Sequence, residues 1–480
     1  MRILQLASEA VPFAKTGGLA DVVGALSTYL GGAGHRAELV LPYYREVKLA
    51  QPARDTDVAM EFGASELGTT DAGRLVSGPR VDGLRVWFVD VPELFDRDGL
   101  YGPPGSDYPD NLLRFAAYVR AALLASDRLE FRPDIVHCHD WQAALAPGWL
   151  PAGTASVMTI HNLAYQGWFP AAQRAPLEAP HPNRFEFPGT GDLNLLAAGL
   201  RAADQVTTVS KRYAAEIATP ELGFGLDPIL RGLEHPVEGI LNGIDTTVWD
   251  PSTDPWLPAP YGPENLEGKA DSRADLAEAF RIDAPTGIPV FGLVSRLVDQ
   301  KGIGLFEDLR QQIAAWTDAR FVFLGTGDPR HEADLESLAR LPNVGVRIEF
   351  SERLAHLVEA GSDFFLMPSV FEPCGLNQMI SQRYGTLPIV HRTGGLADSV
   401  THADRAAIDA GTASGIVFEH PDAAGLEWAI GKAIDLFADG PTYRRIQQLV
   451  MRIDHSWAGR GREYEQMYER VFTRLRQTTS

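Results

Sequence analysis

The chain has 480 residues, of which 45% are hydrophobic and 22% are charged. This length exceeds what one hydrophobic core normally serves, so it predicts two domains. The formal net charge is −20, from 43 Lys and Arg against 63 Asp and Glu, which argues against binding to nucleic acid or an anionic membrane surface. An anionic ligand must therefore be held by local cations.

The first residues and the cysteines bear on the compartment. Met1–Lys15 contains one Arg and an apolar run interrupted by Ser8 and Glu9, which is too polar for a signal peptide. No stretch approaches the roughly 18 apolar residues of a membrane span. The two cysteines, Cys138 and Cys374, suit neither a disulfide framework nor a zinc knuckle. We therefore expect a cytoplasmic protein that does not contact a membrane.

Short apolar runs, bounded by Gly, Pro, Asp or Asn, alternate with segments of helical periodicity. This alternation is typical of a parallel sheet with helices between its strands. In the first half of the chain, the runs are Ile3–Leu6, Glu38–Leu41, Asp134–His137, Val157–Ile160 and Val206–Val209.

The same alternation restarts after the proline-rich stretch Asp250–Pro263, which we interpret as a linker. The pattern predicts an α/β protein of two Rossmann-like, doubly wound parallel-sheet domains, residues 1–250 and 251–455, that face each other across a deep cleft. Open α/β sheets bind ligands beyond the carboxyl ends of their strands, so the cleft is the expected active site. The later runs are Pro289–Val294, Phe321–Leu324, Val346–Phe350, Phe364–Met367 and Pro388–Val390.

A glycine pair follows the first predicted strand and opens a helical pattern. Free N–H groups and the positive end of a helix dipole form an anion site, and Lys15 adds a cation beside Gly17 and Gly18. A diphosphate suits this turn, although a purely structural turn explains the glycines as well. The string TGGLAD recurs from Thr393, through Gly394 and Gly395, which favours a shared function for the two turns.

Two cations follow the strand Pro289–Val294, five residues apart. Arg296 and Lys301 can both reach one pyrophosphate, and they can stabilise a leaving nucleoside diphosphate without a metal. Solvated loop charges are the alternative interpretation.

A glutamate follows the strand Phe364–Met367 within the sequence FEPCGL. Pro373 biases Glu372 away from helical geometry, so its carboxylate can point into the cleft toward sugar hydroxyls or a developing positive charge. The amides of Cys374, Gly375 and Leu376 can face the same ligand, although simple helix capping remains the alternative.

Polar and aromatic residues end two strands in the first half, at His137–Gln142 and Thr159–Pro170. This mixture suits a sugar ring. His137 and His139 with Asp140 permit a metal site as the weaker interpretation, because no further ligand cluster accompanies them. The turn that contains Asn242 indicates a loop and nothing more specific.

These segments together resemble the bacterial and plant glycogen and starch synthase family, the ADP-glucose-using glucosyltransferases of the GT-B fold. The resemblance runs from the first strand to about residue 420. The matching strings are KTGGLADVVGAL at 15–26, YPDNLLRF at 108–115, HDWQAALAP at 139–147, TIHNLAYQGWFP at 159–170, GILNGID at 239–245, SRLVDQKG at 295–302, FEPCGL at 371–376 and YGTLPIVHRTGGLADSV at 384–400.

The resemblance implies a retaining transfer of glucose from ADP-glucose to an α-1,4-glucan, with no metal or organic cofactor. It implies a C-terminal segment, about 456–480, that returns to the N-terminal, acceptor-side domain, whereas the second domain binds the nucleotide sugar. The catalytic group would be Glu372, His161, Arg296, Lys301 and Asp140. The donor-binding group would be Lys15, Gly17, Gly18, Asp21, Asn242, Cys374, Gly375, Leu376, Thr393, Gly394 and Gly395.

Several residues depart from the usual pattern of the family. Val370 and His391 stand where cations are common, so each removes a positive charge near the donor. Ser27, Asn377 and Ile380 also differ from the residues that the family usually has there.

Three alternatives stay open on the sequence. A GT-B transferase that uses UDP-glucose is the nearest, and a glucan-binding homologue without catalysis would fit the two lost cations. A nicotinamide dehydrogenase shares the strand–helix rhythm but requires a Gly-rich dinucleotide fingerprint, which the first strand lacks. The sequence does not indicate an oligomeric state.

Overall fold

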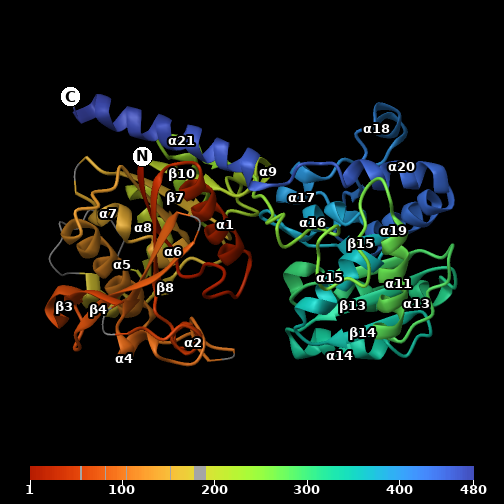
Figure 1. Ribbon diagram of the computed structural model, residues 1–480, viewed down its shortest axis with the longest axis horizontal. Coiled ribbons are helices and arrows are strands. Elements are labelled where there is room, and N and C mark those ends of the chain that lie inside the picture. Colours follow the sequence, from red (N-terminus) through yellow and green to blue (C-terminus); the bar gives the residue numbers. More distant parts are fainter. Residues whose placement is uncertain (55–56, 82, 104, 152, 178–190, 480) are drawn as a thin grey trace. The chain divides into compact units, whose positions relative to one another are not determined.

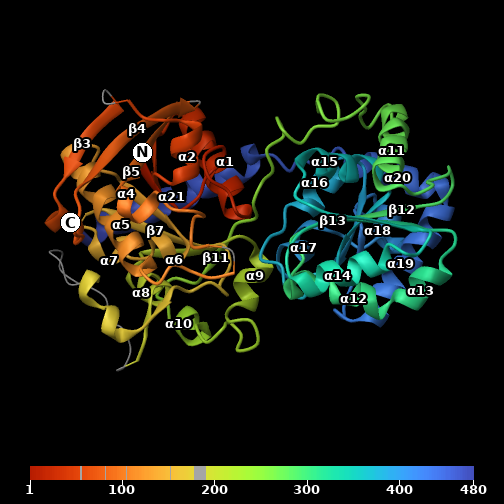
Figure 2. The ribbon, with the colours of Figure 1, turned by 90° about the horizontal axis from the view of Figure 1, so that it is seen from below.

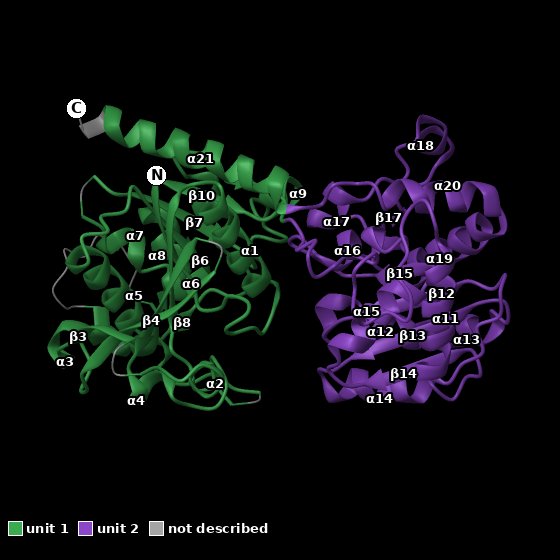
Figure 3. Cartoon of the chain, viewed as in Figure 1, with its two compact units in different colours: residues 1–242, 457–480 green, residues 243–456 purple. Residues whose placement is uncertain are grey.

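The computed structural model describes residues 1–54, 57–81, 83–103, 105–151, 153–177 and 191–479 (Figure 1). The chain forms two compact units, unit 1 with Met1–Asn242 and Trp457–Ser480, and unit 2 with Gly243–Ser456 (Figure 3). The proline-rich stretch from Asp250 therefore belongs to unit 2. No helix in the described ranges is long and apolar enough to cross a membrane.

The described part of unit 1 contains a nine-stranded sheet in the order β11-β10-β7-β6-β1-β2-β5-β4-β3. Neighbouring strands pair in parallel, except that β4 pairs antiparallel with both β3 and β5. The strands are β1 (Arg2–Leu6), β2 (Arg36–Pro42), β3 (Val58–Phe62), β4 (Gly73–Val81), β5 (Leu84–Asp90), β6 (Ile135–His139), β7 (Ala155–Ile160), β10 (Gln205–Thr208) and β11 (Glu238–Gly239).

Helices join these strands, and a short antiparallel pair, β8 (Trp168–Phe169) with β9 (Leu193–Asn194), forms a separate sheet. The C-terminal helix α21 packs against α1 (Figures 1 and 2). Its side chains Tyr464, Met467 and Tyr468 are buried. The helices are α1 (Gly18–Gly32), α2 (Arg45–Ala50), α3 (Ala64–Leu67), α4 (Pro92–Phe95), α5 (Asn111–Arg128), α6 (Asp140–Ala143), α7 (Ala146–Trp149), α8 (Leu195–Ala202), α9 (Lys211–Glu216), α10 (Asp227–Arg231) and α21 (Trp457–Thr479).

Unit 2 has an all-parallel sheet in the order β14-β13-β12-β15-β16-β17. The strands are β12 (Val290–Val294), β13 (Arg320–Gly325), β14 (Val344–Ile348), β15 (Phe364–Met367), β16 (Leu387–His391) and β17 (Ile416–Phe418). The helices are α11 (Glu267–Phe280), α12 (Gly304–Asp308), α13 (Arg310–Ala315), α14 (Pro329–Leu338), α15 (Glu352–Gly361), α16 (Asn377–Arg383), α17 (Gly394–Ser399), α18 (Arg405–Ala410), α19 (Ala423–Ala438) and α20 (Gly440–Val450).

Alternate residues of the unit 2 strands supply two separate cores. Phe291, Phe321 and Phe364 pack on one face with ring centroids 5.1 and 5.3 Å apart. Val290 and Val322, one position along, belong to the core of the other face. Because successive side chains of a strand point to opposite faces, a continuous apolar run fills both cores, which explains why these strands read as uninterrupted hydrophobic sequence.

The strand order reverses direction at one place in each unit. In unit 2 this switch point lies between β12 and β15, and in unit 1 it lies between β1 and β6. Ligands of doubly wound sheets bind beyond the carboxyl ends of the strands at such a point. The prediction of two doubly wound domains is confirmed, and it directs attention to the loops that follow these four strands.

Candidate active site

Three loops interlock at the carboxyl ends of the unit 2 strands. Backbone and side-chain bonds join the loop after β12 to the loop after β15: the Gln300 side-chain amide donates to the Phe371 carbonyl at 3.1 Å, and the Val370 N–H donates to the Gln300 carbonyl at 2.9 Å. The loop after β16 joins them, because the Gly395 N–H donates to the Glu372 carbonyl at 3.1 Å. The three loops therefore form one body at the switch point.

An ion pair lies at the centre of these loops. Lys301 Nζ lies 2.5 Å from Glu372 Oε2, and Ser369 Oγ donates to the same carboxylate oxygen at 3.0 Å. Only 6% of Glu372 is exposed. The structure thus brings together two residues that are 71 positions apart in sequence. A cation and a carboxylate held this closely can serve groups of opposite charge on one ligand.

The glycines of these loops are required by close packing. At Gly394, with φ +41°, a Cβ atom would run into the Glu372 carbonyl, and at Gly395 it would run into Cys374. Gly375 has φ +70°, a backbone angle that residues other than glycine rarely adopt. Thr393 precedes helix α17 as its N-cap. The turn therefore lies directly against the Glu372 loop.

The remaining predicted residues of unit 2 differ in exposure. Arg296 is exposed, and its side chain makes no hydrogen bond or ion pair with the described residues. Cys374 is buried, and Leu376 precedes helix α16. Arg296 is thus available to an anionic ligand, whereas Lys301 is held by Glu372.

Two of the residues that depart from the family pattern, His391 and Asn377, make structural hydrogen bonds. His391 Nδ1 lies 2.8 Å from the Ser369 carbonyl, so it supports the loop that carries Glu372. Val370 is 46% exposed, and Ile380 is buried in α16. The Asn377 amide donates to the Val294 carbonyl at 2.9 Å, which ties α16 to the end of β12.

In unit 1, the glycine pair opens α1 as expected. The Gly17 and Gly18 N–H groups donate no hydrogen bond to the described residues. Lys15 is half exposed and pairs with Asp21 at 2.7 Å. Buried Glu9 fixes the preceding residue, because it accepts from the Thr16 hydroxyl at 2.7 Å and from the Thr16 N–H. The turn thus presents donor groups and a cation on a braced loop.

The two glycine turns differ in backbone geometry. Gly17 is extended with φ −161°, and the helix begins at Gly18. In the second copy, the helix begins one position earlier, at Gly394, with φ +41°. Identical sequence therefore serves two different turns.

Asp140 and His161 follow neighbouring strands of unit 1. Asp140 Oδ1 accepts from the His161 N–H at 2.7 Å, and Asp140 has φ +55°, a strained conformation for a residue with a side chain. Burial raises the pKa of Asp140 to about 7. Burial lowers the pKa of His161 to about 3, so its ring is neutral. The positive φ and the shifted pKa values make this corner a candidate functional site.

Asn242 ends the first segment of unit 1. It is buried, and its Oδ1 accepts no hydrogen bond from any described residue. A buried polar atom of this kind calls for a partner that the protein alone does not provide.

The histidines considered as metal ligands bond to other groups. His137 Nε2 lies 2.6 Å from Thr159 Oγ1, and His139 Nε2 lies 2.8 Å from Gln5 Oε1. Among the described residues, no group of three His, Cys, Asp or Glu side chains is arranged to hold a metal ion.

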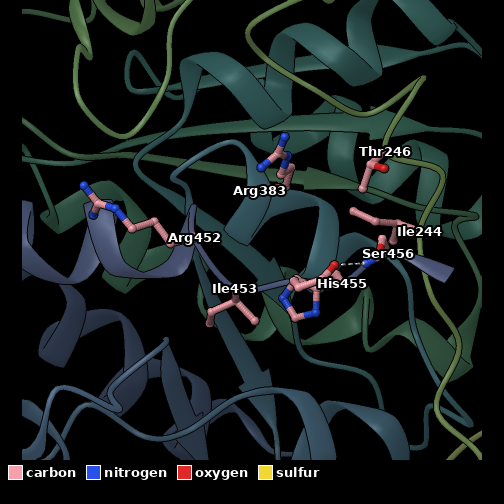
Figure 4. A pocket seen from close by; sticks show the side chains of 8 residues that line it. Ile244, Thr246, Arg383, Arg452, Ile453, His455 and Ser456 are labelled. Carbon is pink, nitrogen blue, oxygen red and sulfur yellow. Dashed lines mark hydrogen bonds between the residues drawn. The ribbon is translucent and has the colours of Figure 1, made fainter. Parts of the chain in front are cut away.

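A cavity of about 290 Å³ in unit 2 lies apart from the predicted residues (Figure 4). Its two arginines have acidic partners, Arg383 with Asp250 and Arg452 with Glu264 at 2.6 Å. The lining residues are Ile244, Thr246, Arg383, Arg452, Ile453, Asp454, His455 and Ser456.

Sequence reasoning missed the residues that brace the site. Gln300 donates to the Phe371 carbonyl 71 positions away, which no motif spacing signals, whereas Glu9 and Ser369 bond to side chains within their own loops. Glu9 carried one usable signal, since it is a charged residue three positions after the end of the buried strand β1.

Two family models match the chain. The model for the starch synthase catalytic domain matches residues 2–232, and the model for glycosyl transferases group 1 matches residues 277–448. The chain is 42% identical to glycogen synthase 1 of Methylococcus capsulatus, over 98% of this chain and 96% of that protein. It is 43% identical to glycogen synthase of Myxococcus xanthus, over 98% and 99%.

Solved structures agree. The catalytic domain of starch synthase IV from Arabidopsis thaliana, bound to ADP and acarbose, superposes with a TM-score of 0.85 at 32% identity, over 98% of this chain and 99% of that one. Sucrose-phosphate synthase from Thermosynechococcus elongatus shares the fold, with a TM-score of 0.62 at 18% identity over 98% and 99%. The chain therefore belongs to the glycogen and starch synthase family of GT-B glycosyltransferases.

Proposed function

We propose that this enzyme is a glycogen synthase that transfers glucose from ADP-glucose to the 4-hydroxyl at the non-reducing end of an α-1,4-glucan, with retention of anomeric configuration. The observation that carries the proposal is the Lys301–Glu372 pair, held by Ser369 at the switch point of unit 2. The glycogen synthases that match over nearly the whole chain support the reaction. The starch synthase that was solved with ADP and acarbose supports the donor and the acceptor class.

Unit 2 supplies the charge that the reaction needs. The diphosphate of the donor gains negative charge as the glycosidic bond breaks, and Lys301 and exposed Arg296 can stabilise it. The Glu372 carboxylate can stabilise positive charge at the anomeric carbon or bind sugar hydroxyls. The backbone of Cys374, Gly375 and Leu376, with the turn from Thr393, would border the donor.

Unit 1 would supply the second set of groups. Lys15 and the Gly17 turn would contact the donor phosphates, because the Gly17 and Gly18 N–H groups donate to no described residue and the Lys15 ammonium, although paired with Asp21, is half exposed. His161 and Asp140 would border the transferred glucose, and Asp21 and Asn242 would complete the donor side. We propose same-face attack, in which the leaving phosphate takes the proton of the glucan 4-hydroxyl.

A UDP-glucose-dependent transferase is the second candidate. Val370 and His391 replace cations that the family commonly has, and that change favours an altered nucleotide preference.

A cytoplasmic location is also proposed, supported by two free cysteines that are both buried.

A donor comparison tests the proposal. Purified full-length enzyme, with glycogen as primer, would be given labelled ADP-glucose or UDP-glucose, and incorporation into glycogen would be measured. We expect a kcat/KM at least about tenfold higher with ADP-glucose, which corresponds to about 1.4 kcal/mol. Incorporation from UDP-glucose alone would overturn the donor assignment. Tight glycogen binding without consumption of either donor would identify a non-catalytic glucan-binding protein.

A further inference from the structure

A continuous chain of hydrogen bonds runs from His161 into the core of unit 1. His161 Nε2 lies 2.9 Å from His139 Nδ1, and His139 Nε2 lies 2.8 Å from Gln5 Oε1. The Gln5 amide nitrogen lies 3.3 Å from the hydroxyl of Tyr468 on α21. From there the chain continues through His137 Nδ1 at 2.7 Å to Thr159 Oγ1 at 2.6 Å.

The orientation of Gln5 fixes the direction of these bonds. Its side-chain oxygen can only accept, so the proton of neutral His139 must be on Nε2. His139 Nδ1 then carries a lone pair and can only accept, so His161 must donate from Nε2. A neutral histidine has one ring proton, and therefore Nδ1 of His161 is left unprotonated.

The three histidine rings that take part in these hydrogen bonds are neutral. Burial lowers the pKa of His137 and that of His161 to about 3, and it lowers the pKa of His139 well below its ordinary value. The charged groups around them are few: the His161 backbone N–H donates to the Asp140 carboxylate, and His139 faces Gln5 and two histidines. The charged form of histidine, in which both ring nitrogens carry a proton, therefore does not complicate the tautomer assignment.

The free nitrogen of His161 is accessible. Nδ1 makes no hydrogen bond with any described residue, and it is absent from the buried atoms that lack a partner, so solvent reaches it. His161 is 9% exposed. It follows Ile160, the last residue of β7, and so it lies at the carboxyl edge of the unit 1 sheet.

We propose that His139 is a positioning residue that holds His161 in the Nε2–H tautomer, so that Nδ1 accepts a hydrogen bond from a hydroxyl of the sugar. The tautomer assignment stands on the geometry of unit 1 alone, and the sugar clause rests on the proposed function. His139 touches no substrate in this account, and it acts through His161. Gln5 sets the direction of these hydrogen bonds. Its own side chain is bonded to Tyr468, which belongs to the C-terminal helix.

The tautomer can be measured directly in the free protein. Full-length enzyme with 15N-labelled histidine would be studied by long-range 1H–15N correlation, with His161 identified by its loss in His161→Gln. We expect a protonated Nε2 and an unprotonated Nδ1 for His161. A protonated Nδ1 on His161 would overturn the proposal. In that case His161 Nε2 would accept instead of donate, and the hydrogen bonds from His161 to Gln5 would all be reversed.

Three variants separate positioning from simple packing. His139→Leu removes the acceptor, and His139→Asn restores one, because its side-chain oxygen takes the place of Nδ1. His137→Leu is the matched control: this residue is equally buried on the same strand and also loses two hydrogen bonds, but those bonds go to Tyr468 and Thr159 and not to His139 or His161.

We expect kcat/KM for glucosyl transfer to fall about 10- to 100-fold in His139→Leu, mainly through kcat, and the His161 tautomers to mix. His139→Asn should recover most of the loss, and His137→Leu should keep the wild-type tautomer and a rate within about threefold. Equal losses in both leucine variants would overturn the proposal. If His139→Leu fails to fold, the wild-type spectrum and His139→Asn still decide. Absence of transfer by the wild-type enzyme would refute the proposed function, while the tautomer measurement would still judge this inference.

Discussion

The Lys301–Glu372 pair is the part of unit 2 to which we assign the chemistry of the proposed reaction. Both side chains lie in loops that follow strands at the switch point, and the Glu372 carboxylate is buried. Moving charges out of water costs free energy, and pairing them often does no more than recover that cost. A buried ion pair at this place is therefore better explained by function than by stability.

Removing either partner should abolish turnover without unfolding the enzyme. We expect Lys301→Ala and Glu372→Gln each to lower kcat by at least about 100-fold, because a charge that stabilises the transition state is lost. Circular dichroism should show native structure in both. Lys432→Ala is the control, since Lys432 forms an exposed surface pair with Asp435 at 3.7 Å. Wild-type turnover in both site variants would refute the site assignment.

Asp140 should leave a signature in the pH dependence of stability. Its pKa is about 7 in the folded protein and about 3.9 in an unfolded chain, so the folded state binds the extra proton between these values. Stability from this group is therefore present below about pH 4 and is lost as pH rises through about 7, by on the order of 4 kcal/mol. Asp140→Asn removes the titration and tolerates the positive φ.

Urea unfolding at pH 5 and pH 8 measures this effect. Relative to Asp140→Asn, the wild-type enzyme should lose more unfolding free energy between the two pH values. An equal loss in both proteins would mean that Asp140 does not titrate as its burial indicates.

At the scale of elements, close packing of loops shapes the candidate active site of unit 2. The turn at Gly394 lies against the carbonyl of Glu372, so a change in one loop displaces the other. Backbone positions of this kind tolerate no side chain.

Gly394→Ala should therefore impair both stability and turnover. We expect a loss of about 1–3 kcal/mol in unfolding free energy, from strain at positive φ and the collision with the carbonyl, together with a large fall in kcat. Gly431→Ala is the matched control, because it lies within α19 and its Cβ meets no atom within 4 Å. That variant should be as stable as the wild type or more so, by up to about 1 kcal/mol. Comparable damage in both variants would contradict this view of the turn.

The sequence predicted most of the central parallel strands and missed the end of the unit 1 sheet. Phe364–Met367 matches β15 at both ends, because an apolar run that fills two cores has no alternative environment. The strands β3 and β4 were missed because they are partly exposed and mix polar residues into their runs, and β5 was missed although it is buried and parallel to β2. Glycine motifs and strand ends indicated the candidate site residues, but the contact of Gln300 with Phe371 joins segments 71 positions apart, which no motif spacing signals.

At the scale of the whole molecule, the C-terminal helix ties the end of the chain to unit 1. Tyr464, Met467 and Tyr468 of α21 are each at most 1% exposed. The chain passes through unit 2 and returns, so unit 1 is complete only when residues from both ends are present. The strand–helix alternation, which occurs twice in the sequence, predicted two domains. That α21 belongs to the first of them could be predicted only from the family resemblance.

Met467→Ala should destabilise unit 1 through a cavity. Truncation of a buried methionine costs about 2–5 kcal/mol, so calorimetry should show part of the protein unfolding at lower temperature. Glu469→Ala, on the exposed side of the same helix, should change stability by less than about 0.5 kcal/mol. Equal stability of the two variants would show that α21 does not pack as described.

The most direct test of the account is the stereochemistry of the product. Enzyme, ADP-glucose labelled with 13C at C1 and a maltooligosaccharide acceptor would be combined, and the new linkage would be followed by NMR. We predict a labelled α-1,4-linked glucose at the non-reducing end, formed as ADP is released. A β-linked product, or release of free glucose without chain extension, would contradict the proposed reaction.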